Sequence, residues 1–131
     1  MNGMFTVSLS QCYRADLRWN RVPHAIIGQE VGLTTKQLSA IRNVSTALSN
    51  NVDPNHVLSD LQRAALIYTD WSTRNVHIPQ EVFDKLKSFL DDKQIVEATL
   101  TVGAYNMVSR FLVAVDVGDK ANVKVPEPSD E

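Results

Sequence analysis

The chain of 131 residues contains a single cysteine, Cys12. One thiol cannot form an intramolecular disulfide, which excludes a redox dithiol and a cysteine-rich metal site within one chain. The sequence also lacks a run of roughly 20 apolar residues, the length that a membrane-spanning helix needs, and its first residues form no basic leader. We therefore expect a soluble cytoplasmic protein that has no membrane partner.

The sequence also has no strong excess of charge of either sign. The 13 Lys and Arg residues are scattered against 15 Asp and Glu residues, with a net charge of -2, so nucleic acid is not expected as a partner. The three histidines, His24, His56 and His77, share no metal-ligand spacing. We expect neither a metal nor a cofactor.

Capping signals and apolar spacing predict an all-α fold, a compact helical bundle of about five main helices. Thr34, Ser59 and Asp91 are each followed three residues later by a glutamine, the pattern of a capping box. Gly32 and Gly118 suit the left-handed residue that follows a helix end. The predicted helices cover approximately residues 21–31, 34–48, 59–73, 79–90 and 91–118.

Two of these helices are predicted to be well buried. In the helix that begins near Ser59, Leu66 and Ile67 widen the apolar stripe toward a second neighbour, and Tyr68 and Trp71 are expected in the core or an interface. In the last helix we expect one broad stripe to face the core. That stripe contains Ile95, Val96, Leu100, Ala104, Met107, Val108, Phe111, Leu112 and Val115.

The helical pattern divides the chain into three parts. Residues 1–19 give only weak signals, and residues 20–118 form the predicted helical domain. Residues 119–131 contain two prolines and several acidic residues with almost no large apolar group, so we expect a flexible acidic tail.

Four segments, in order, resemble the carboxymuconolactone decarboxylase and alkylhydroperoxidase D superfamily. They are PHAIIGQEVGL, LSDLQRAALIYTDWSTR, VHIPQEVFDKLKSFLDDKQIVE and YNMVSRFLVA, and the resemblance covers roughly His24 to Gly118. His24 precedes Gly32 by eight residues, as in the family's histidine-containing helix. The resemblance implies an alkylhydroperoxidase D-like fold, a homo-oligomer of three or six chains, and His24 as the catalytic residue.

The chain also departs from this family. The paired cysteines of the peroxidase branch would fall at Leu17 and Asn20. Of the activities that the family has, peroxidase activity is therefore the least compatible with this chain and its single cysteine. The decarboxylase branch lacks that pair, but its additional acid would fall close to Phe5, whereas the first acid here is Asp16. The partner for proton transfer is therefore missing or replaced.

Candidate substrate-binding residues are Tyr105, Asn106 and Arg110. Asn106 and Arg110 lie four residues apart, so an amide and a guanidinium share one helix face and could hold a carboxylate or lactone oxygen. Alternatively, Arg110 ties helix ends and backbone carbonyls together. His24 could exchange a proton near neutral pH or simply be a partly exposed residue at a helix start.

Two functions follow from these alternatives. The resemblance implies cofactor-independent decarboxylation of a small carboxylated lactone or related cyclic acid. The alternative is a non-catalytic relative, a structural or small-molecule-binding subunit that has lost its proton-transfer partners. Compared with the family, the chain is short by the N-terminal helices. We expect such an incomplete bundle to expose apolar stripes, which self-association would cover.

Overall fold

The computed structural model describes residues 26–42 and 55–116 of the chain. Within these ranges it contains five helices and no strand, and 75% of the residues are helical, which confirms the predicted all-α fold class. The helices are residues 26–30, α3 (Thr35–Arg42), α4 (Asp60–Arg74), α5 (Gln80–Lys87) and α6 (Asp92–Ala114).

All three predicted capping boxes are present. At the start of α6, Gln94 N donates to Asp91 Oδ1 over 2.8 Å, and Asp91 N donates to Gln94 Oε1 over 3.0 Å. Equivalent reciprocal hydrogen bonds join Ser59 to Gln62 and Thr34 to Gln37. Because these bonds satisfy amide groups that have no intrahelical partner, they fix where each helix begins.

Gly32 ends the first described helix in the left-handed conformation that the sequence predicts. Its φ is +96°, and its amide donates to Gln29 O while the Leu33 amide donates to Gly28 O. These two bonds form a Schellman motif, and the side chain of Leu33, which follows Gly32, is buried. At the end of α6 the left-handed residue within the described range is Asp116, with φ 45°, and Gly118 lies outside that range.

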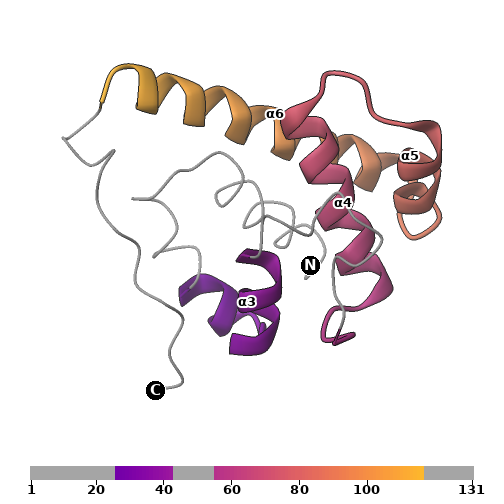
Figure 1. Ribbon diagram of the computed structural model, residues 1–131. Coiled ribbons are helices and arrows are strands. Elements are labelled where there is room, and N and C mark those ends of the chain that lie inside the picture. The colour runs from indigo at the N-terminus through magenta and orange to yellow at the C-terminus, as the bar shows by residue number, and fades with distance from the viewer. Residues whose placement is uncertain (1–25, 43–54, 117–131) are drawn as a thin grey trace.

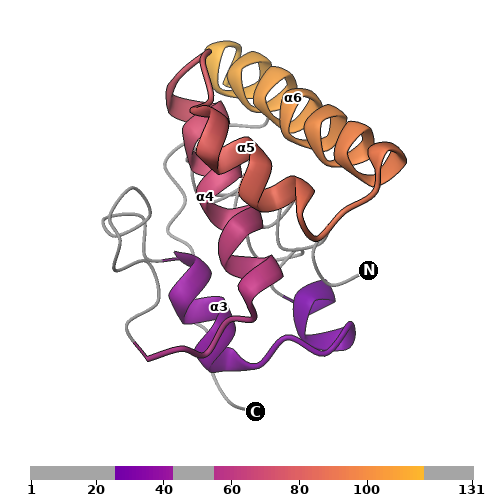
Figure 2. The same cartoon turned by 90° about the vertical axis from the view of Figure 1, so that its right-hand side faces the viewer.

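Helix α4 lies at the centre of the described residues and is buried on two sides, as predicted (Figures 1 and 2). One cluster joins Leu66 of α4 to Leu33, Leu38, Ile41 and Leu58. The other cluster joins α4 to α5 and α6 and contains Ala64, Ala65, Tyr68, Leu86, Ile95 and Val102. Tyr68 is almost fully buried, which confirms its predicted place in the core.

Helix α6 runs along one edge of the molecule, and its C-terminal end extends beyond α4 and α5 (Figure 1). The prediction that its broad apolar stripe faces the core is wrong. Of the nine residues in that stripe only Ile95 is buried, Leu112 is half-buried, and the others are exposed. The buried residues of α6 are Ile95, Ala98, Val102, Asn106 and Ser109.

The buried side of α6 consists mostly of small or polar side chains. Ala98 and Val102 are buried, Val102 in the cluster that contains α4 residues, and the buried Asn106 and Ser109 donate hydrogen bonds to carbonyls one turn earlier in their own helix. Polar groups that are satisfied locally can be buried at little cost. Their burial leaves the larger apolar side chains on the opposite side of the helix.

Across the described ranges, no helix combines the length and hydropathy that crossing a bilayer requires. The predicted N-terminal segment, residues 1–19, and the predicted tail, residues 119–131, lie outside the described residues. Their assignment as separate parts of the chain stays a prediction.

Candidate functional site

Asn106 and Arg110 lie together on α6, as their spacing predicts. Arg110 Nη1 donates to Asn106 Oδ1 over 2.8 Å, and Asn106 Nδ2 donates to Val102 O over 3.1 Å. Arg110 Nη2 also donates to the backbone oxygen of Thr73 in the last turn of α4, over 3.3 Å. The guanidinium therefore connects two helices that lie far apart in the sequence.

The contact with Thr73 O is of the kind that the structural alternative for Arg110 requires. Carbonyls in the last turn of a helix have no intrahelical partner, and this end of a helix carries partial negative charge. A guanidinium at this position supplies both a donor and a positive charge. Binding of a substrate carboxylate by Asn106 and Arg110 stays a prediction.

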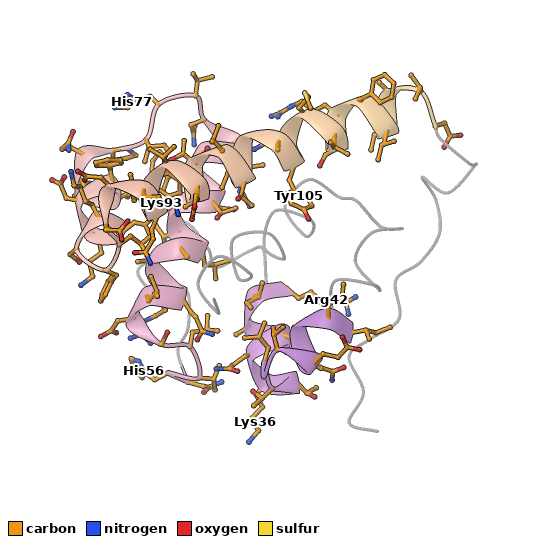
Figure 3. The ribbon with its side chains drawn as sticks, turned by 180° about the vertical axis from the view of Figure 1, so that it is seen from behind. Lys36, Arg42, His56, His77, Lys93 and Tyr105 are labelled. Atoms are coloured by element: carbon orange, nitrogen blue, oxygen red, sulfur yellow. The ribbon has the colours of Figure 1, made fainter. Side chains whose placement is uncertain are left out.

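Tyr105 does not share this face. It precedes Arg110 by five residues, which places the two side chains roughly 140° apart around an α-helix. Tyr105 is half-buried and points to the side of α6 on which α3 lies (Figure 3). The structure therefore brings together two of the three predicted substrate-binding residues, and Tyr105 lies apart from them.

Two of the three histidines lie within the described residues. His24, the predicted catalytic residue, lies outside the described residues, so its role stays a prediction. His56 precedes the start of α4 and His77 follows its end, and both are exposed (Figure 3). The 15 residues of α4 separate these two histidines by roughly 20 Å. Over the described ranges, no group of three or more His, Cys, Asp or Glu side chains could hold a metal ion.

A buried carboxylate near the end of α4 escaped the sequence analysis. Asp70 is 0% exposed, and its Oδ1 accepts a hydrogen bond from Arg74 Nε over 3.1 Å. The i, i+4 spacing of an acid and an arginine could have revealed the pair, although spacing alone does not show burial. Arg110 contacts the same end of α4, through the backbone oxygen of Thr73. Arg74 and Arg110 therefore both lie at the last turn of α4.

One side of α6 carries several exposed apolar side chains. We define the outward face of α6 as Val96, Leu100, Gly103, Ala104, Met107 and Phe111. Its large side chains are 55%, 66%, 68% and 63% exposed at Val96, Leu100, Met107 and Phe111. Charged residues flank this face, with Lys93 and Glu97 paired at 3.7 Å near one end. A contiguous apolar surface of this kind marks interaction sites on soluble proteins.

Comparison with known proteins adds no relative. No protein-family model matches the chain, and neither a curated protein nor a solved structure matches it significantly. The resemblance to the carboxymuconolactone decarboxylase and alkylhydroperoxidase D superfamily therefore stays a prediction.

Proposed function

We propose that this protein is a non-catalytic helical protein that self-associates through α6. The observation that carries the proposal is the outward face of α6, whose four large apolar side chains are each more than half exposed. A helix that is apolar around most of its circumference is stable when buried on all sides. The described part of the chain covers only one side of α6, and further copies of the chain would cover the other.

The hydrogen bonds of α6 also favour this function over catalysis. Asn106 accepts from Arg110 and donates to Val102 O, and Arg110 also donates to Thr73 O. These contacts commit both candidate substrate-binding groups to holding the fold together. A substrate carboxylate would have to compete with them for the guanidinium.

Self-association through this face should be of moderate affinity. A single large side chain such as phenylalanine has roughly 150–250 Å² to bury, so the exposed fractions on the outward face amount to several hundred Å² per copy. Specific interfaces bury about 800 Å² per partner, so this face lies at the lower end of that range. Interfaces at this end of the range are typical of transient complexes, so we expect an oligomer that dissociates on dilution.

Analytical ultracentrifugation over a series of protein concentrations tests the proposal. The wild-type chain should sediment as an oligomer that dissociates on dilution, and Leu100→Glu should remain monomeric because association would bury a charge. Val76→Glu is the matched control, since Val76 is fully exposed outside α6 and the charge change is the same. Circular dichroism should show unchanged helicity in both variants. A wild-type chain that stays monomeric throughout the series would contradict self-association.

A second candidate function requires a substrate carboxylate to replace the contact of Arg110 with Thr73 O. Because Asn106 holds the guanidinium in a fixed orientation, Arg110 could bind a carboxylate of a small lactone or cyclic acid. We propose His24 as the residue that would move the proton in a cofactor-independent decarboxylation. The homo-oligomer of three or six chains that the resemblance implies stays a prediction.

Release of carbon dioxide from candidate carboxylactones tests this second function. We expect wild-type turnover to be abolished in His24→Ala and strongly reduced in Arg110→Lys, because lysine lacks the planar donor fork. Turnover that survives loss of the imidazole would contradict the role of His24. Inertness of the wild-type chain toward every carboxylactone would leave self-association as the function.

A further inference from the structure

The outward face of α6 is symmetric about the peptide bond between Gly103 and Ala104. Leu100 and Met107 lie three residues on either side of the central pair, and Val96 and Phe111 lie seven residues on either side. An α-helix rises 1.5 Å per residue, so each member of a pair is equally far from the centre along the helix axis. Reversing the direction of the helix therefore places apolar residues at the same heights.

This pattern fits a second copy of the same helix running in the opposite direction. In a two-fold interface the same surface patch is used by both subunits and must complement itself. An antiparallel pair centred on Gly103 and Ala104 sets Leu100 level with Met107 of the other copy, and Val96 level with Phe111. It also places the positive end of each helix near the negative end of the other.

Gly103 provides an independent reason for a close partner at the centre. A glycine inside a helix destabilises that helix relative to alanine. No heavy atom within 4 Å would contact a Cβ at this position, so the packing of the chain itself does not require a glycine there. Small residues at a helix crossing allow two backbones to approach closely, and Ala104 extends that small surface.

We propose that two copies of the protein pair antiparallel through the outward faces of α6, with the two-fold axis at Gly103 and Ala104. This inference rests on the proposed self-association and adds its partner, direction and register. The large side chains on each side of the small centre pack against those of the other copy. The flanking charges, including Lys93 and Glu97, remain at the rim of the interface in contact with water.

Disulfide cross-linking in full-length Cys12→Ser protein tests the register. Ala104 lies next to the axis, so Ala104→Cys should form a covalent dimer on mild oxidation, within the Cα separation that a disulfide tolerates. Val96 lies seven residues from the centre, which separates the two copies of that residue by roughly 22 Å along the helices. Val96→Cys alone should therefore give no dimer. An equimolar mixture of Val96→Cys and Phe111→Cys should give the mixed dimer.

The outcomes separate this inference from the proposed self-association. A covalent dimer of Val96→Cys alone would indicate parallel helices and overturn the antiparallel register. A wild-type oligomer that Leu100→Glu dissociates in the ultracentrifuge, with no cross-link in any cysteine variant, would overturn the antiparallel register but leave self-association through α6 standing. A monomeric wild-type chain, whose α6 another segment of the same chain covers, would overturn both. Circular dichroism of each variant verifies that the helices are formed.

Discussion

Replacing Gly103 with alanine should stabilise the monomeric chain. Gly103 has no left-handed φ and lies inside α6, and a Cβ built there meets no heavy atom within 4 Å. The substitution therefore adds no steric conflict, and it removes the conformational freedom that glycine gives to the unfolded chain. We expect the free energy of unfolding to rise by about 0.8–1.0 kcal/mol, the difference in helix propensity between the two residues.

Urea unfolding followed by circular dichroism, at concentrations low enough for the chain to be monomeric, measures this change. For a small protein the slope is about 1–3 kcal/mol per molar urea, so the midpoint should rise by roughly 0.3–1 M. The matched control is Gly32→Ala, which makes the same chemical change at φ +96°. This variant should lose about 1–2 kcal/mol, because a Cβ is strained in the left-handed region.

Gly103→Ala also reports on the α6 interface. If two helices approach closely at Gly103, an added methyl group on each copy pushes them apart, so Gly103→Ala should weaken the dimer while it stabilises the monomer. A lower urea midpoint for Gly103→Ala in dilute solution would refute the reasoning, since it would mean that an atom of the same chain occupies the space next to Gly103.

Two further tests concern the packing of α4. The Tyr68 hydroxyl lies 2.8 Å from Thr99 Oγ1, so Tyr68→Phe and Thr99→Val should each cost about 0.5–1.5 kcal/mol. A double-mutant cycle by urea unfolding should show that the two losses are not additive, and additive losses would exclude the hydrogen bond. Leu86 of α5 is 0% exposed in the cluster that it shares with α4 and α6. Leu86→Ala should therefore lower the free energy of unfolding by about 2–5 kcal/mol. A midpoint in urea equal to that of the wild type would contradict its burial.

Features that depend on a few neighbouring residues could be predicted from the sequence. The capping boxes at Thr34, Ser59 and Asp91 and the left-handed Gly32 need only local chain geometry, and all four are present. The contact between Asn106 and Arg110 is also local, because four residues make slightly more than one helical turn. Such patterns specify helix boundaries and shared faces without reference to the rest of the chain.

The side of α6 that faces the core could not be predicted in this way. Periodicity shows which residues share a face, but it does not show which neighbour that face meets. Helix α6 is apolar around most of its circumference, and Asn106 and Ser109 can be buried because carbonyls of their own helix accept their hydrogen bonds. The contact of Arg110 with Thr73 O likewise depends on how α4 and α6 cross, since 37 residues separate the two.

The position of α4 between two apolar clusters implies an order in which parts of the molecule open. Helix α3 belongs to only one of these clusters, whereas α4 contributes to both. Amide protons in the middle of α4 should therefore exchange with solvent deuterium only when both clusters separate, which amounts to global unfolding. Those of α3 can exchange after a smaller opening in which α4, α5 and α6 stay together.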